Sequence, residues 1–132
     1  MQPEKVIMAF DFGLARTGVA IGNTLVREAK PVGIIYAKTN EERWKAIGAM
    51  VAEWQPDAFV VGVPRHGDGT PNELTARCER FARQISGRFC RPSACVDERF
   101  SSVAVEGGRE KIDDQAAAVI LQQYFEEQSD SI

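Results

Sequence analysis

The sequence lacks several features that mark common classes of protein. Its longest apolar stretches, such as Phe59–Val63 and Ala116–Leu121, are far shorter than the roughly 20 residues needed to cross a bilayer. The first residues lead directly into a strand-like segment, without the hydrophobic region of a secretory signal. We therefore expect a soluble, cytoplasmic protein with no membrane partner.

Cysteine and histidine are also scarce, which limits the crosslinks and metal sites that the chain can hold. There are 3 cysteines and 1 histidine, and no two cysteines form a Cys-x-x-Cys pair. In a cytosolic protein such cysteines are expected to be reduced thiols. A zinc site of Cys90, Cys95 and His66 would not have the spacing of the common zinc motifs, so we do not expect one.

Positive charge is not in excess either. The chain has 16 Lys and Arg against 19 Asp and Glu, a net charge of −3, so it has no global attraction to nucleic acid. Binding to nucleic acid would depend on local basic surface or on metal ions that bridge to phosphate. Arginines do cluster in one stretch, at Arg77, Arg80, Arg83, Arg88 and Arg91. Glutamates are interleaved with them, so we favour an ordinary charged surface over a nucleic-acid patch.

The hydrophobic pattern predicts a single α/β domain spanning residues 1–132. The chain is 44% hydrophobic, which suits one sizeable core. The predicted elements follow the order β-β-β-α-β-α-β-α, typical of an α/β fold. The predicted strands are Val6–Asp11, Thr17–Gly22, Pro31–Tyr36, Ala58–Val63 and Ala94–Asp97. The last helix is predicted from about Ile112 to Glu127, after a short helix that starts in Ser101–Val105.

Two capping boxes predict where the first two helices begin. Thr39–Glu42 opens a helix that Pro56 stops. Thr70–Glu73 is predicted to open the next helix, with Pro71 at its first position and Gly87 as its C-terminal glycine.

Acidic residues stand where strands end and where the last helix begins. Asp11 ends an apolar strand, and a carboxylate there is costly unless it has a cation or several hydrogen bonds. Asp97 and Glu98 follow another strand, and Asp113 opens the last helix. If the two strands are neighbours and the helix packs over their ends, these acids converge where α/β sheets normally hold their sites.

Converging carboxylates without histidine ligands favour Mg²⁺ or Mn²⁺ over zinc. Such ions activate water and stabilise the leaving oxygen in phosphodiester hydrolysis. Each acid also has a structural explanation. Asp113 and Asp114 can cap a helix, and Asp97 and Glu98 can pair with surface arginines. Asp11 is the hardest to explain without a ligand.

Four segments, in order, resemble the motifs of the YqgF (RuvX) family, predicted Holliday-junction resolvases that are also linked to maturation of the 5′ end of pre-16S ribosomal RNA. The segments are Asp11–Ala20, Val61–Pro64 with Asp68–Thr70, Asp97–Ser102, and Lys111–Asp113 with the helix that follows. The match covers nearly the whole chain, and four ordered motifs are far more specific than one.

The resemblance implies a ribonuclease H-like fold, with a central mixed five-stranded sheet flanked by helices, and a divalent-metal nuclease. It implies Asp11, Glu98 and Asp113 as the catalytic and metal-binding acids. Asp97 is a rival to Glu98, because strand register decides which of the two points inward. A junction resolvase would act as a two-fold dimer, whereas an RNA-processing enzyme has no such need, so the chain is expected to be a monomer or a homodimer.

Three further residues are candidate nucleic-acid contacts. Arg16 and Arg99 lie within the acidic motifs, where a guanidinium can bind a phosphate in bidentate fashion. His66 lies in a loop where the family usually has an asparagine; it can replace that asparagine as a contact, although we favour a solvated loop residue. The segment between Ser102 and Lys111 is several residues shorter than is usual in the family, which can alter substrate choice.

Two other classes of protein are compatible with part of the pattern. The Asp-x-Gly segment at Asp11 also resembles the first phosphate loop of actin-like and sugar-kinase ATPases, which need two lobes to enclose ATP, and this chain supplies about one. A non-catalytic nucleic-acid-binding or ribosome-associated module is the other alternative. The presence of all three acids favours a nuclease.

Overall fold

The computed structural model of the chain describes residues 4–66, 68–97 and 113–130. Its elements follow the predicted order. The strands are β1 (Val6–Asp11), β2 (Arg16–Asn23), β3 (Lys30–Tyr36), β4 (Ala58–Val63) and β5 (Ser93–Asp97), and the helices are α1 (Asn40–Trp54), α2 (Thr75–Phe89) and α3 (Asp114–Asp130). Each predicted strand therefore agrees with an observed one to within one residue at either end.

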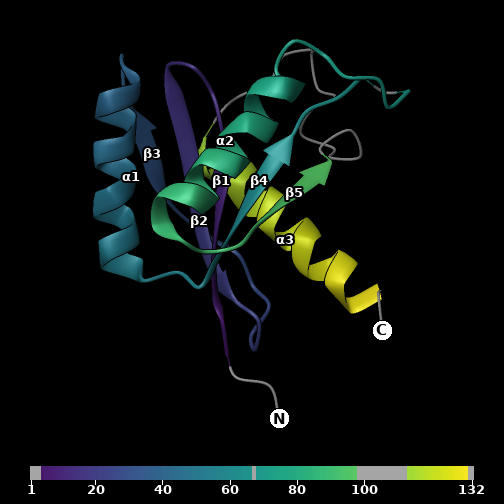
Figure 1. The fold of residues 1–132 in the computed structure, drawn as a ribbon. Helices are drawn as coiled ribbons and strands as arrows, with labels where there is room; N and C mark the ends of the chain where they lie inside the picture. Colours follow the sequence, from purple (N-terminus) through teal and green to yellow (C-terminus); the bar gives the residue numbers. More distant parts are fainter. Residues whose placement is uncertain (1–3, 67, 98–112, 131–132) are drawn as a thin grey trace.

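The strands form one mixed five-stranded sheet in the order β3-β2-β1-β4-β5. β1, β4 and β5 are parallel, while β2 pairs antiparallel with both β1 and β3. Helices α1 and α2 cover one face of this sheet, and α3 crosses the other face (Figure 1). The predicted mixed sheet flanked by helices is confirmed.

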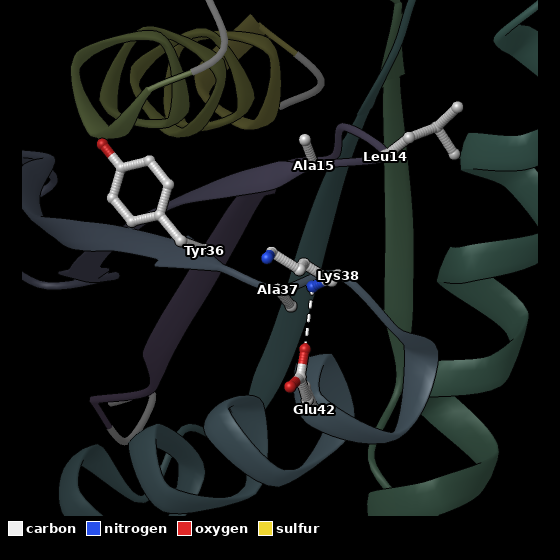
Figure 2. A pocket seen from close by; sticks show the side chains of 6 residues that line it. All are labelled: Leu14, Ala15, Tyr36, Ala37, Lys38 and Glu42. Atoms are coloured by element: carbon white, nitrogen blue, oxygen red, sulfur yellow. Dashed lines mark hydrogen bonds between the residues drawn. The ribbon is translucent and has the colours of Figure 1, made fainter.

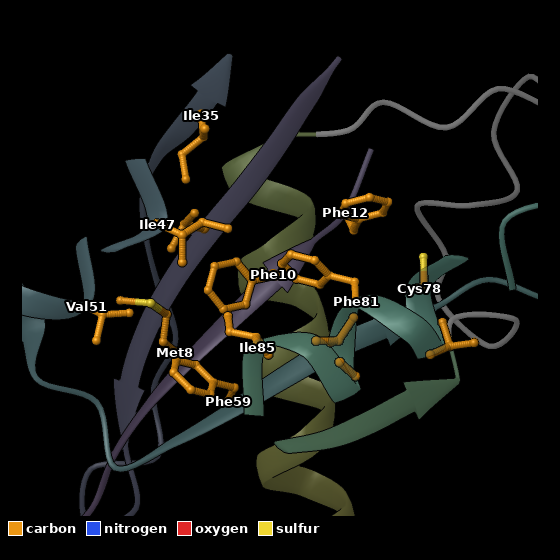
Figure 3. Close-up of a cluster of buried hydrophobic side chains, with 14 of the residues drawn as sticks. Met8, Phe10, Phe12, Ile35, Ile47, Val51, Phe59, Cys78, Phe81 and Ile85 are labelled. Atoms are coloured by element: carbon orange, nitrogen blue, oxygen red, sulfur yellow. The ribbon is translucent and has the colours of Figure 1, made fainter. Parts of the chain in front are cut away.

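Alternation along β1 assigns each side chain to one of two cores. Met8 and Phe10 face α1 and α2, in the larger core drawn in Figure 3. Ile7 and Ala9 face α3, in a smaller core. Because Asp11 continues the second series, its side chain belongs to the α3 face of the sheet.

The first predicted capping box is present at the start of α1. The Thr39 hydroxyl accepts a hydrogen bond from the Glu42 amide at 3.1 Å, and the Glu42 carboxylate accepts one from the Thr39 amide at 3.3 Å. The helix ends at Trp54, and Gln55 takes a left-handed conformation (φ 49°) just before Pro56. The prediction for this helix is confirmed at both ends.

The second predicted capping box is wrong. Thr70 does not cap α2: its hydroxyl and its amide both donate to the Asp68 carboxylate, at 2.7 and 3.0 Å. Its carbonyl accepts from the His66 amide at 2.9 Å, so this segment folds back as a turn rather than a helix. The bonds from Thr70 lower the pKa of Asp68 below its ordinary value.

Leu74 precedes the first residue of α2 and makes no side-chain capping bond. The Asn72 side-chain oxygen holds the turn that leads into the helix, because it accepts from the Leu74 and Thr75 amides at 2.8 and 3.1 Å. The predicted end at Gly87 is also wrong. The helix continues to Phe89 and closes with Cys90 in a left-handed conformation (φ 55°). The prediction for Ser101–Val105 lies outside the described residues. No helix among those described is long and apolar enough to span a membrane.

A candidate active site at the carboxyl end of β1

Asp11 is a buried carboxylate at the carboxyl end of the central strand. Only 4% of its surface is exposed. Across the sheet it pairs with Gly18 of β2, and both residues belong to the face that α3 covers. The Cα atoms of two such cross-strand partners lie about 4.5–5.5 Å apart. Any group seated on Gly18 is therefore adjacent to Asp11.

The group seated on Gly18 is the beginning of α3. A Cβ atom built on Gly18 would lie 1.9 Å from the carbonyl oxygen of Asp113 and 2.8 Å from the amide nitrogen of Asp114. Close packing recurs four residues along β2, where a Cβ on Gly22 would lie 2.6 Å from the carbonyl oxygen of Glu28 and 3.0 Å from the Phe125 ring. Glycines on β2 thus allow α3 to lie directly on the strand, which brings Asp113 next to Asp11.

Asp113 also caps α3. Its Oδ1 accepts a hydrogen bond from the Ala116 amide at 2.9 Å, and its carbonyl accepts from the Ala117 amide at 3.2 Å. The explanation that Asp113 caps a helix is therefore correct. A carboxylate has two oxygens and about four lone-pair positions, so capping uses only part of its capacity.

Asp97 lies on the opposite face of the sheet from Asp11. Its neighbour Val96 packs against α3, so alternation turns Asp97 toward α2. There its carboxylate lies 3.9 Å from Arg65, which itself lies 3.2 Å from Glu79. β1 and β5 are not neighbours, because β4 lies between them, and strands two apart are separated by roughly 10 Å. The first condition stated for the convergence of Asp97 and Glu98 with Asp11, that the two strands are neighbours, is therefore not met.

The remaining predicted residues are distributed as follows. Glu98 and Arg99 lie outside the described residues. Arg16 begins β2 opposite Tyr36, at the same end of the sheet as Asp11. His66 is exposed in the turn after β4, where its carbonyl accepts from the Gly69 amide at 2.8 Å. Within the described ranges, no three His, Cys, Asp or Glu side chains are grouped closely enough to hold a metal ion.

A hollow of about 720 Å³ opens beside this end of the sheet. Figure 2 shows its lining residues, Leu14, Ala15, Tyr36, Ala37, Lys38 and Glu42. The side chains of Leu14 and Tyr36 are 55% and 70% exposed, so two large apolar groups face solvent here. Sequence reasoning missed this feature. The sequence gives one indication of it. Leu14 follows an apolar strand and Tyr36 ends one, at positions where a polar turn residue would be usual.

The structure also contains a buried arginine that sequence reasoning missed. Arg43 is 5% exposed; its guanidinium donates to the Asn40 side chain at 2.6 Å and to the carbonyl of Leu14. It also lies over the Phe12 ring, 5.1 Å from the ring centre. Burial lowers the pKa of Arg43, although an arginine stays protonated at neutral pH. The sequence around Arg43 looks like that of an exposed position on a helix, so no pattern indicated that its side chain is buried.

Solved structures with the same architecture identify the class of fold. The chain aligns with RuvC of Thermus thermophilus over 95% of its length and 96% of that chain, with a TM-score of 0.57 and 13% identity. It aligns with the fowlpox virus Holliday junction resolvase over 92% and 99% of the two chains, with a TM-score of 0.54 and 14% identity. At such low identity these matches concern the fold, which is that of the ribonuclease H-like resolvases.

The sequence comparison gives the family. The model of the RuvX family, described as Holliday junction resolvase, matches residues 5–127, and the chain belongs to this family. A protein of Burkholderia vietnamiensis, provisionally named a pre-16S rRNA nuclease, is 48% identical over 138 residues, which cover 96% of this chain and 93% of the relative. The predicted family is confirmed. The chain is thus a nuclease, a hydrolase of phosphodiester bonds, rather than an ATPase fragment or a non-catalytic module.

Proposed function

We propose that the chain, as a single domain, is a divalent-metal-dependent endonuclease in which Asp11, Glu98 and Asp113 are the catalytic acids. The substrate would be structured nucleic acid, with the 5′ end of pre-16S ribosomal RNA first and Holliday junctions second. The name of the Burkholderia relative supports the RNA, and the description of the family supports the junction. The observation that carries the proposal is the packing of Asp113 on Gly18, beside the buried Asp11.

The donor set fits Mg²⁺ or Mn²⁺. Asp11 and Asp113 offer hard carboxylate oxygens at one end of the sheet, which these ions prefer over nitrogen or sulfur. Two ions of this kind, when bound, supply activation of water and stabilisation of the leaving oxygen. The role of the chain is to hold the carboxylates in place: Asp11 by its rigid central strand, and Asp113 by its capping bond to Ala116.

Glu98 is proposed as the third acid in preference to Asp97. The support comes from Asp97 itself, which faces α2 and lies near Arg65, on the side of the sheet away from Asp11. A carboxylate on that side contributes to the local charge balance of Arg65 and Glu79 rather than to the site at β1.

We propose that the substrate strand reaches this site over the hollow beside Tyr36. An exposed aromatic ring is a surface on which a nucleobase stacks, at roughly 1–3 kcal/mol per base. Arg16, directly across the strand pair from Tyr36, is suited to the adjoining phosphate. Arg99 is proposed as a second phosphate contact. His66, exposed in a separate turn, would contribute only at the margin of the substrate.

The experiment measures cleavage by the purified protein. A 5′-labelled pre-16S RNA fragment and a synthetic four-way DNA junction are incubated with Mg²⁺ or Mn²⁺, and with EDTA as the blank. We expect metal-dependent cleavage of at least one substrate. Asp11→Asn, Glu98→Gln and Asp113→Asn should each lower the rate 100-fold or more, because each removes a ligand charge from the site.

Two matched variants make the test specific. Asp97→Asn and Asp114→Asn remove the same charge from neighbouring positions and should retain most of the activity. The proposal would be refuted if the protein cut neither substrate, or if Asp11→Asn kept full activity. The mass of the active species in solution then separates a monomer, sufficient for a single RNA cut, from the two-fold dimer that a junction resolvase needs.

A further inference from the structure

Helices α1 and α2 both lie on the face of the sheet opposite α3 (Figure 1), and residues of these two helices line a basic groove. It consists of two hollows of about 140 and 580 Å³ that share Asn40, Trp44 and Gln84 in their linings. The inner hollow is lined by three arginines, Arg43, Arg77 and Arg80, and by no acidic residue. The outer hollow carries Lys45 and Arg88 against one acid, Glu41. The groove is therefore positive along its length.

The two edges of α2 differ sharply in charge. Arg77, Arg80, Gln84 and Arg88 are spaced three or four residues apart, so they form one stripe facing the groove. The single acid of the helix, Glu79, lies on the other edge, where it pairs with Arg65. Among the described residues, none of the groove arginines has a carboxylate within salt-bridge distance. An ordinary charged surface would mix both signs along each edge.

Arg43 adds a buried cation at the inner end. Its Nε is fully enclosed and has no hydrogen-bond partner among the described residues. Burial of a charge without an opposite charge is costly, and an anion in the adjoining hollow would offset this cost. The guanidinium already has its orientation set by Asn40 and Phe12, so little conformational entropy would be lost on binding.

Aromatic side chains complete the floor of the groove. Trp44 stacks on Phe81 with ring centres 5.4 Å apart, and the guanidinium of Arg88 lies 4.3 Å from the Trp44 ring centre. Alternating arginines and aromatic rings are the composition of surfaces that follow a nucleic-acid strand. A free phosphate would need the cations but not the extended, ring-lined floor.

We propose that this groove binds the phosphodiester backbone of the substrate strand, at a distance from the cut, with phosphates on Arg77, Arg80 and Arg43. Leu14 lines both the inner hollow and the hollow beside Tyr36, so the groove adjoins the hollow over which we propose that the strand reaches the active site. The inference rests on the proposed nuclease function. On this proposal, the strand leaves the active site in the direction of the groove between α1 and α2.

The test compares two double variants that remove the same charge, one from the groove edge of α2 and one from outside the groove. Arg77→Ala with Arg80→Ala removes two arginines of the groove edge. Arg83→Ala with Arg91→Ala removes one arginine elsewhere on the helix and one just after it. Binding of a fluorescent RNA strand is measured with Asp11→Asn as the background, so that no cleavage occurs. We expect about 10-fold weaker binding for the groove pair and less than 3-fold for the control pair.

Salt dependence gives a second readout. For a single strand, each phosphate contact contributes about −0.7 to the slope of log K against log salt concentration. The slope for the groove pair should therefore be less steep by roughly 1.4. Trp44 gives a third: with Trp54→Phe, tryptophan fluorescence should change on adding the RNA strand, and should not change on adding inorganic phosphate at the same phosphate concentration.

The outcomes separate this inference from the proposed function. If the unmodified protein cuts RNA or junctions but both double variants bind equally well, the groove inference fails and the nuclease stands. If inorganic phosphate alone reproduces the Trp44 signal, the groove is a small-anion site and the inference fails. If the protein cuts neither substrate, the proposed function fails, whereas selective loss of binding in the groove pair still supports the groove.

Discussion

Gly18 and Asp113 are in direct backbone contact: the carbonyl oxygen of Asp113 lies 1.9 Å from the position that a Cβ on Gly18 would take. This contact joins the first motif of the chain to the last. It seats the start of α3 against β2, on the strand pair that carries Asp11. The position of one candidate acid therefore depends on the absence of a single methyl group.

Gly18→Ala is expected to displace the start of α3 and to separate Asp113 from Asp11. Overpacking of this kind typically costs 1–3 kcal/mol, and a shift of about 1 Å at a catalytic group can cost 100-fold in rate. Urea unfolding and the cleavage assay measure the two effects. Gly48→Ala is the control, since nothing lies within 4 Å of its added Cβ and a helix interior gains roughly 0.5–1 kcal/mol from alanine. Normal activity in Gly18→Ala would show that the contact does not position the site.

Asp113 can be tested for its two roles separately. Asparagine and serine are also good N-cap residues, so Asp113→Asn and Asp113→Ser should keep the free energy of unfolding within about 1 kcal/mol of the unmodified protein. Asp113→Ala should cost about 1 kcal/mol more, because the Ala116 amide loses its acceptor. All three should lose activity equally if the carboxylate is catalytic. An active Asp113→Asn would reduce the residue to a helix cap.

The sheet could be predicted because its signals are local. Alternating or continuous apolar runs gave every strand, and the Thr39–Glu42 capping box gave the start of α1, since each depends only on neighbours in the chain. The same reasoning failed at Thr70. Its capping-box pattern was present, but the Thr70 hydroxyl donates to the nearer carboxylate of Asp68, and Asn72 bonds the turn that leads into α2.

The site was only partly predictable, for a different reason. The burial of Asp11 follows from its own strand, whereas the contact between Gly18 and Asp113 joins residues far apart in the chain. The family resemblance carried the acids over, but the face of the sheet to which Asp97 belongs follows from the packing of its neighbour Val96 against α3. The burial of Arg43 depends on the packing of α1 against Phe12 and Leu14, which no pattern within α1 reveals.

The Asn72 turn that leads into α2 provides a stability test of the corrected helix start. Asn72→Ala should lower the free energy of unfolding by about 1 kcal/mol, up to 2, because the Leu74 and Thr75 amides lose their acceptor. Thr70→Ala should change it by less than about 0.5 kcal/mol, since Thr70 and Asp68 are both exposed. Chemical denaturation of the two variants decides the matter. A larger loss for Thr70→Ala would restore the capping box predicted from the sequence.

Asp68 gives a prediction for pH. Hydrogen bonds from the Thr70 hydroxyl and amide lower its pKa below the ordinary value of 3.8. A lowered folded-state pKa stabilises the protein above the ordinary value, and this stabilisation is lost as the pH falls through the folded-state pKa. In Thr70→Ala the hydroxyl is gone and the amide remains, so the pKa should rise part of the way back. Carboxyl NMR titration of the two proteins measures it, and an unchanged pKa would contradict the assignment.

Tyr36 provides the sharpest test of the substrate path. Tyr36 is 70% exposed and lines the hollow of Figure 2, so Tyr36→Ala should leave the unfolding temperature nearly unchanged. If a nucleobase stacks on the ring, this variant should raise KM by roughly 5-fold to 150-fold, as expected from 1–3 kcal/mol of stacking, while Tyr36→Phe should act like the unmodified protein. Leu25→Ala is the matched control, because Leu25 is 73% exposed in the turn between β2 and β3, at the opposite end of the sheet. Equal effects of Tyr36→Ala and Leu25→Ala would mean that the hollow takes no part in substrate binding. A selective loss in Tyr36→Ala would show that the substrate contacts this ring, at the end of the sheet that carries Arg16 and Asp11.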